Sequence, residues 1–142
     1  MKELKNFAHY KGDWNPKWLE NLIDNTKKYI IRVDFKKHIT TSAGFATLVR
    51  ENSKEKMKVS IHNEIDEPSR FGVLCHELAH IFLGHLGSDQ DRWWTYRLNL
   101  NHDSVEIEAE AVAFTVTQRL GLKGSKGCDI IFSRNLYEGV GL

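Results

Sequence analysis

The stretch CHELAHIFLGH, residues 75–85, places three histidines and one glutamate among apolar neighbours. Histidine and glutamate are seldom fully buried unless a partner compensates them, so the stretch raises the question of what that partner is. Asp66 is an N-cap candidate and Pro68 lies near the first turn that follows it. Together they predict a helix over about residues 68–85.

Two histidines of this helix have the spacing of metal ligands. His76 and His80 are four residues apart, so they share a helix face and can chelate one ion. Glu77 lies about 100° round the helix from His76, where it can reach a water on that ion without being a ligand. This H-E-x-x-H arrangement is typical of zinc hydrolases. The alternative is that both histidines are core residues with satisfied hydrogen bonds.

The other two polar or reactive side chains of the stretch have simpler interpretations. His85 is nine residues from His76, so a continuous helix carries it to the opposite side, unless Gly84 ends the helix first. We expect His85 to be a histidine near the helix C-terminus, favoured there by the helix dipole, rather than a third ligand. Cys75 is expected to be a buried free thiol.

A second helix is predicted over about residues 104–120, closed by Gly121. A helical wheel places Glu106 and Glu110 on one face, pointing into apolar surroundings, and Glu108 on the polar side. Glu106 would complete three protein ligands with one open position, as expected of catalytic zinc. Glu110 would accept the free ring N–H of His76 or His80.

Other roles for these side chains compete with that assignment. Asp103 and Glu106 have the spacing of a capping box, which would make Glu106 a helix-capping residue. Glu108 and His102 are the reserve ligand candidates. An oxyanion donor is also expected, and His102, Tyr96 and Tyr137 are its candidates.

The rest of the chain predicts an α+β domain. Asn15 before Pro16 predicts a helix over about 16–28, and β-branched and aromatic residues predict a strand over 29–35. Residues 42–51 and 57–64 are expected to form a hairpin. We therefore expect one domain over 1–142, with a small antiparallel sheet packed on the two helices that carry the histidines and glutamates.

Two segments have a possible link to substrate binding in this scheme. The strand near residues 58–63 could receive an extended substrate by strand addition, or could be an ordinary edge strand. The connection from Gly87 to His102 is long for a compact domain, so it is expected either to be a lid or to pack over the core. It carries Trp93, Trp94 and Tyr96.

Composition narrows the class of protein. The chain has 142 residues, 41% of them hydrophobic, and a net charge of +1 from 20 Lys and Arg against 19 Asp and Glu. This balance gives no basic field for nucleic acid or an anionic membrane. Two cysteines are too few for a secreted disulfide scaffold, and no apolar run approaches the roughly 20 residues of a membrane span. We expect a soluble, cytoplasmic protein.

HELAHIFLGH (76–85) followed by EIEAEAVAF (106–114) resembles the ImmA/IrrE family of zinc metallopeptidases, and especially its ArdC-related branch. The likeness covers roughly residues 15–122. It implies a compact gluzincin-like α+β fold, cytoplasmic Zn²⁺, and proteolysis of regulatory proteins such as phage or stress-response repressors. His76, His80 and Glu106 match the metal ligands of the family, and Glu77 matches its catalytic base. Relatives often carry Asn or Asp at the position of Glu110.

Together these observations predict a zinc-dependent peptidase in which Glu77 takes a proton from water and returns it to the leaving amine. Two other classes of function compete with it. One is an ArdC-like antirestriction or DNA-directed module, which the neutral charge balance disfavours. The other is a zinc-stabilised interaction module that keeps the ligands and cleaves nothing.

Overall fold

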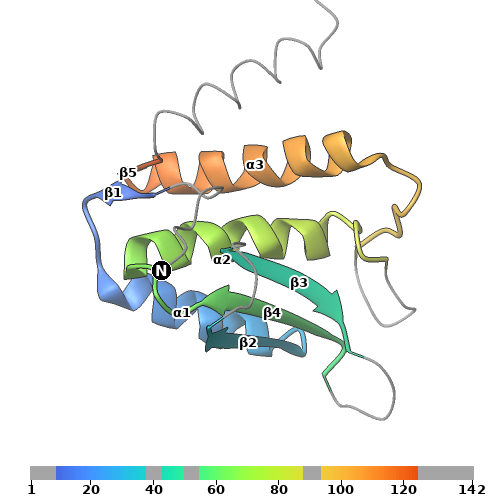
Figure 1. Cartoon of the computed structure of the whole chain (residues 1–142), viewed down its shortest axis with the longest axis horizontal. Coiled ribbons are helices and arrows are strands. Elements are labelled where there is room, and N and C mark those ends of the chain that lie inside the picture. The colour runs from blue at the N-terminus through green and yellow to red at the C-terminus, as the bar shows by residue number, and fades with distance from the viewer. Residues whose placement is uncertain (1–8, 38–42, 50–54, 88–93, 125–142) are drawn as a thin grey trace, which may run out of the picture.

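Figure 1 shows the computed structural model of the chain, which describes residues 9–37, 43–49, 55–87 and 94–124. These ranges form a small α+β fold, with a three-stranded sheet, three helices and a separate pair of two-residue strands. In chain order the elements are β1 (Lys11–Gly12), α1 (Pro16–Lys27), β2 (Ile31–Lys36), β3 (Gly44–Leu48), β4 (Met57–His62), α2 (Glu67–Phe82), α3 (His102–Arg119) and β5 (Leu122–Lys123).

All three helices begin at a side-chain cap. The Asn15 side chain accepts a hydrogen bond from the backbone N–H of Lys17 at the start of α1, and Asp66 and Asn101 do the same for Ser69 in α2 and Ser104 in α3. These bonds satisfy backbone donors that the first turn of a helix leaves unpaired. The predicted helices are confirmed, and α1 and α3 match their predicted bounds within two residues.

Helix α2 ends three residues earlier than predicted, at Phe82. Gly84 has φ of +77°, the left-handed conformation that commonly terminates helices. A Cβ at this position would lie 1.7 Å from the carbonyl oxygen of Thr95, so only glycine fits here. The chain therefore turns away from the helix axis before it reaches His85.

The sheet is mixed, so the prediction of an antiparallel sheet is wrong. Its strand order is β2-β4-β3. β3 and β4 form the predicted antiparallel hairpin, with Gly44 opposite Ile61, whereas β2 pairs with β4 in parallel, with Ile31 opposite Met57. The reason is that β4 is buried along almost its whole length and takes a neighbour on each side, which separates β2 from β3.

The central place of β4 also changes the expectation for substrate binding. Residues 58–63 fall largely on this central strand, whose two edges are both paired, so it cannot receive a further strand. The outer strand next to it in the hairpin is β3.

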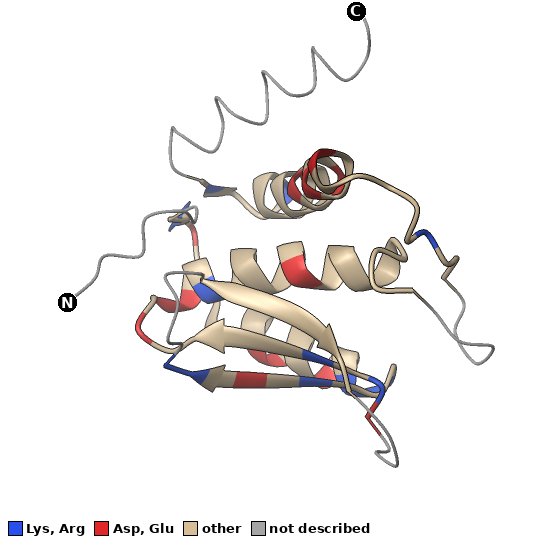
Figure 2. Ribbon diagram, turned by 45° about the vertical axis from the view of Figure 1, so that its right-hand side comes forward, with Lys and Arg blue, Asp and Glu red and all other residues tan. Residues whose placement is uncertain are grey.

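Helix α2 is the centre of the fold. It lies between the sheet and α3 and contacts α1, α3, β3 and β4 (Figures 1 and 2). Its fully buried Leu74 and Ile81 belong to the same core as Val59 and Ile61 of β4. A Cβ at Gly44 would lie 2.6 Å from Val73 Cγ1, so this glycine lets β3 approach α2 closely.

Several side chains outside the sheet also have defined places. Cys75 is buried and free, as predicted, and burial raises the pKa of its thiol to about 12. Trp94 packs in the core against Phe82 and donates its indole N–H to the carbonyl of Gly87. Of the two expectations for this connection, a lid or packing over the core, Trp94 agrees with packing over the core. Trp93 lies outside the described residues.

The described ends of the fold meet in one small ladder. Lys11 lies opposite Lys123 and Gly12 opposite Leu122 in the antiparallel β1–β5 pair. In the part of the chain that the structure describes, no helix combines the length and apolar character needed to cross a membrane.

Candidate metal centre

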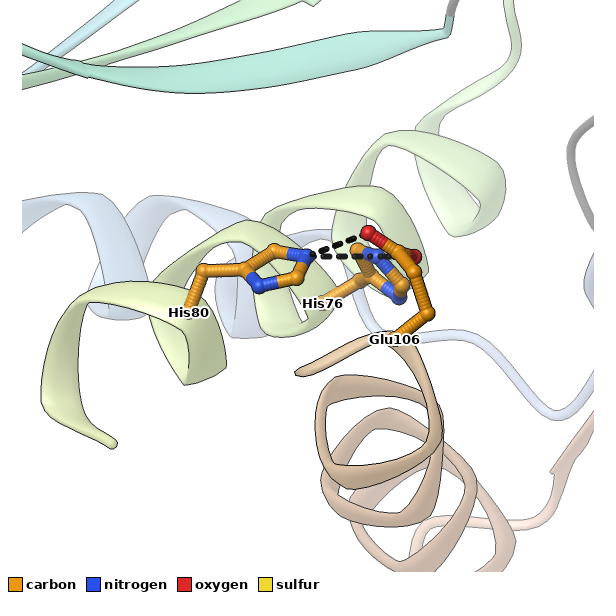
Figure 3. A group of neighbouring side chains, drawn as sticks. All are labelled: His76, His80 and Glu106. Atoms are coloured by element: carbon orange, nitrogen blue, oxygen red, sulfur yellow. Dashed lines mark hydrogen bonds and ion pairs between the residues drawn. The ribbon is translucent and has the colours of Figure 1, made fainter. Parts of the chain in front are cut away.

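Three potential metal ligands from two helices converge between α2 and α3 (Figure 3). His76 and His80 come from successive turns of α2, and Glu106 reaches them from the second turn of α3. Their ligand atoms all lie within 4.8 Å of one another. The structure thus brings together the three side chains that the sequence predicted as one cluster.

The distances within the cluster match a small tetrahedral ion. His76 Nε2 lies 3.1 Å from His80 Nε2 and 3.2 Å from Glu106 Oε2, and His80 Nε2 lies 3.3 Å from Glu106 Oε1. Ligand bonds of about 2.0–2.1 Å in a tetrahedron put neighbouring ligand atoms about 3.3 Å apart. The two histidines face different oxygens of Glu106, and two imidazoles with one carboxylate in this arrangement could hold a metal ion.

The second ring nitrogen of His76 also has a partner. Nδ1 of His76 lies 2.9 Å from Oε1 of Glu110, one turn after Glu106 on α3. An acceptor at this position holds the proton on Nδ1, which leaves Nε2 free to bind a metal. Glu110 therefore stands where the sequence predicted a support for one of the two histidines.

The charges of the cluster compensate one another in the absence of a metal. Burial lowers the pKa of His76, but the hydrogen bonds to Glu106 and Glu110 raise it. The net result is a pKa raised to about 10. The hydrogen bonds from His76 and His80 hold the pKa of Glu106 well below its usual range. A metal ion would replace the proton of His76 as the charge that Glu106 and Glu110 balance.

Glu77 lies beside this cluster and is not part of it. The residue is only 8% exposed, and burial raises the pKa of its carboxyl group. The backbone N–H of Ala46 in β3 donates a hydrogen bond to it. A carboxylate held at this place can accept a proton, because its surroundings favour the neutral form.

The capping-box alternative for Glu106 is wrong. The N-cap of α3 is Asn101, whose side chain accepts from Ser104 N at 2.8 Å, so Asp103 lies inside the helix. The helix start is therefore satisfied without Glu106, whose carboxylate turns toward His76 and His80.

The apolar surroundings expected around Glu106 and Glu110 are only partly present. Their side chains are 41% and 33% exposed, because α3 buries only small residues, namely Ala109, Ala113 and Thr117. The wheel places the two glutamates on one face correctly, but α3 rests on α2 along a narrow strip rather than inside the core.

Two sequence interpretations at the other end of α2 need correction. Because α2 ends at Phe82, His85 does not lie on the opposite side. Its Nδ1 is 2.9 Å from Nδ1 of His80. Its Nε2 is 2.7 Å from Oε1 of Glu108, so Glu108 is not simply a solvent-facing residue. Arg97 completes this group with two 2.8 Å bonds to Glu108, and no periodic or motif signal in the sequence pointed to it.

The two described candidates for an oxyanion donor, Tyr96 and His102, make no polar contact with the ligand cluster. Tyr96 is 60% exposed and its ring lies against Gly87, and His102 is exposed at the first position of α3. Within the described ranges neither forms a hydrogen bond or ion pair with the three clustered residues, and His102 does not join the ligand group. Tyr137 lies outside the described residues.

Comparison of the chain with protein-family models, curated proteins and solved structures gave no match.

Proposed function

We propose that the chain is a zinc-dependent metallopeptidase that hydrolyses peptide bonds of a protein substrate. The observation that carries the proposal is the arrangement of four side chains: His76, His80 and Glu106, whose ligand atoms lie within 4.8 Å of one another, and the buried Glu77 beside them. A purely structural zinc site is normally closed by four protein ligands. Three ligands beside a buried carboxylate favour a catalytic site instead.

His76, His80 and Glu106 would hold the ion, and Glu110 would orient His76 through its Nδ1 proton. Zinc bound here supplies a Lewis acid that polarises a peptide carbonyl and lowers the pKa of water toward about 7. The chain itself supplies the base, because Glu77 neighbours His76 along α2 but lies outside the ligand group.

Glu77 moves the proton in the proposed reaction. Its carboxylate takes a proton from the attacking water and passes it to the leaving amine, so the residue is restored at the end of the cycle. Burial raises its pKa, which makes the carboxylate a stronger base toward the attacking water. The N–H of Ala46 holds the carboxylate in place while it does so.

The position of β3 at the edge of the sheet favours a peptide as the substrate. Ala43 O accepts from His62 N at 2.7 Å, and Val49 N donates to Lys56 O at 3.0 Å, so alternate residues of β3 face β4. The backbone groups of Ala46 therefore point away from β4, and its N–H reaches Glu77. An extended peptide added to this edge would run past the cluster. The family resemblance suggests a regulatory protein, such as a repressor, as the source of that peptide.

Metal analysis and cleavage profiling test this function together. The purified chain is expected to contain one zinc, and a proteome incubated with it is expected to show new peptide termini. Glu77→Gln should keep the zinc and produce no such termini. Glu20→Gln removes an exposed carboxylate of α1 and serves as the matched control with full cleavage. Equal cleavage by wild type and Glu77→Gln would overturn the proposal, and zinc without any cleavage would favour an interaction module.

A further inference from the structure

His80 has a chain of hydrogen-bonding groups behind it, on the side away from the ligand cluster. Its Nδ1 is 2.9 Å from Nδ1 of His85, and the other nitrogen of His85 is 2.7 Å from Glu108 Oε1. Arg97 binds both carboxylate oxygens of Glu108, with Nη1 and Nη2 each at 2.8 Å. The His85 side chain is only 3% exposed, so the middle of this chain of groups is shielded from water, whereas Glu108 and Arg97 are each 33% exposed.

Only one placement of protons satisfies these contacts when both imidazoles are neutral and a metal ion occupies the site next to Nε2 of His80. Nε2 of His85 faces a carboxylate, which only accepts, so this nitrogen must carry the proton. Nδ1 of His85 is then an acceptor, and Nδ1 of His80 must donate to it. His80 is left with a lone pair on Nε2, the atom that lies 3.1 Å from His76 Nε2 and 3.3 Å from Glu106 Oε1 in the ligand cluster. A lone pair that faces a carboxylate needs a cation between the two, so this placement of protons belongs to the metal-bound state.

We propose that His85, Glu108 and Arg97 form a relay that holds His80 in the orientation and tautomer required for metal binding. The proposal rests on the zinc site proposed above. The three members are positioning residues, because they act on the metal site through His80. Each ligand histidine then has its own acceptor: Glu110 acts on His76 directly, and Glu108 acts on His80 through His85.

The geometry of α3 explains why a second histidine is needed. Glu108 follows Glu106 by two residues, which turns it about 200° round the helix and away from the cluster. His85 bridges the gap, and it reaches this place because Gly84 ends α2 and redirects the chain. This turn of the chain also lets the backbone N–H of His85 donate a hydrogen bond to the carbonyl of His80, at 2.9 Å.

Arg97 fixes the far end of the relay to the end of α2. Besides its paired bonds to Glu108, its Nη1 donates to the carbonyl of Leu83 at 3.2 Å, and its backbone N–H donates to Gly84 O at 3.0 Å. A two-pronged guanidinium bond sets the plane as well as the position of a carboxylate. Glu108 is thereby held where His85 can reach it.

Nuclear magnetic resonance of the histidine ring nitrogens tests the relay in the wild-type chain. Correlations between ring protons and ¹⁵N distinguish the two neutral tautomers. We expect His85 to carry its proton on Nε2 with and without zinc, and zinc-bound His80 to carry its proton on Nδ1. A neutral His85 protonated on Nδ1 would overturn the proposal, whatever the metal content.

Substitutions give a second test by zinc competition titration. His85→Leu should weaken zinc binding about 10- to 100-fold, as loss of an outer partner of a ligand histidine usually does. His85→Gln should recover most of this loss, because its amide accepts from His80 and donates to Glu108. Asp103→Asn is the control that leaves affinity unchanged, since it changes an exposed carboxylate of the same helix.

These results separate the relay from the proposed function. If wild type binds no zinc while His85 carries its proton on Nε2, the metallopeptidase proposal fails and the hydrogen-bonded relay stands as a feature of the metal-free fold. If His85→Leu binds zinc as tightly as wild type, the relay fails as a positioning device and the zinc site stands.

Discussion

The residue that links the two helices of the candidate site is Glu106. It is the single member of the ligand cluster on α3, and each of its oxygens lies next to one histidine of α2. Glu106 is also two-fifths exposed, so the core contributes little to its position. Its place in the cluster therefore depends on the charges around it.

Glu106→Gln is expected to abolish tight zinc binding. An amide oxygen is a much weaker zinc ligand than a carboxylate, so the loss should exceed the roughly 10- to 100-fold change typical of outer partners. Competition titration with a coloured chelator measures it, with Asp103→Asn as the control on the same helix. Zinc affinity within a few fold of wild type in Glu106→Gln would assign the third ligand to another residue.

Glu110→Ala is expected to have a smaller effect on the same titration. The substitution removes the acceptor 2.9 Å from His76 Nδ1 but no ligand atom, so zinc should bind about 10- to 100-fold more weakly and with unchanged stoichiometry. Glu110→Gln keeps an acceptor oxygen and should fall between Ala and wild type. An unchanged affinity in Glu110→Ala would show that His76 needs no such support.

At the scale of single elements, local signals predicted the helices well and their ends less well. Asn15 and Asp66 cap helices as expected, because a cap depends only on a few neighbouring residues. His85 lies close to the C-terminus of α2 and outside the ligand group, as expected. Its contacts with His80 and Glu108 were not predicted, because Gly84 ends the helix and changes the direction of the chain. Spacing along α2 and α3 was enough to pair Glu106 with the histidines, since each helix face follows from the period alone.

One short connection holds a strained residue. Ile30, between α1 and β2, has φ of +58°, which is unfavourable for a β-branched side chain. It is kept there by hydrogen bonds from its N–H to Lys27 O and from Lys56 N to its carbonyl. A substitution that relieves this strain should stabilise the fold, because Ile30 is 42% exposed and little buried apolar surface would be lost.

Ile30→Gly is expected to raise the free energy of unfolding by about 1 kcal/mol, because glycine adopts positive φ without the Cβ clash. Denaturant unfolding measures the change. Ile30→Ala is the matched control: it shortens the side chain but keeps Cβ, so it should not stabilise the fold. Stabilisation by Ala equal to that by Gly would mean that the strain is not at the backbone.

At the scale of the whole molecule, the arrangement of the strands lay beyond what the sequence could predict. The β-branched and aromatic residues over 29–35 and the alternating pattern within residues 57–64 indicate strands, but they do not say which strands are neighbours. The parallel pairing of β2 with β4 depends on contacts distant in sequence. Arg97 was not predicted for the same reason, since its partner Leu83 follows the end of α2 whereas its partner Glu108 lies on α3.

The stability of the metal-free protein is expected to depend on pH through the ligand cluster. The pKa of His76 is raised from 6.5 to about 10, so its contribution is complete below about pH 6.5 and is lost as the pH rises toward 10. The pKa of Glu106 is lowered from 4.5, so its contribution is present above that value and is lost in acid. The cluster therefore stabilises the metal-free fold most between these limits.

Thermal unfolding in a chelator at about pH 5.5 and 8.5 tests this dependence. Without metal, the cluster contributes more to the stability of the fold at the lower pH. With zinc the trend should reverse, because zinc binds the deprotonated imidazole. Subtracting the same pair of measurements on His76→Ala isolates the contribution of the cluster. A pH dependence that this substitution leaves unchanged would contradict the expectation.

The narrow strip by which α3 rests on α2 has a consequence for how fast a metal ion can leave. Among the described residues of α3 only Ala109, Ala113 and Thr117 are buried, whereas most of α2 is buried. Local opening is cheapest where few apolar contacts are lost, so amide hydrogen exchange should be faster in α3 than in α2 when zinc is absent. Zinc held by the three proposed ligands would bridge both helices, so its binding should slow exchange in α3 most. The lifetime of bound zinc would then be governed by the rate at which α3 separates from α2.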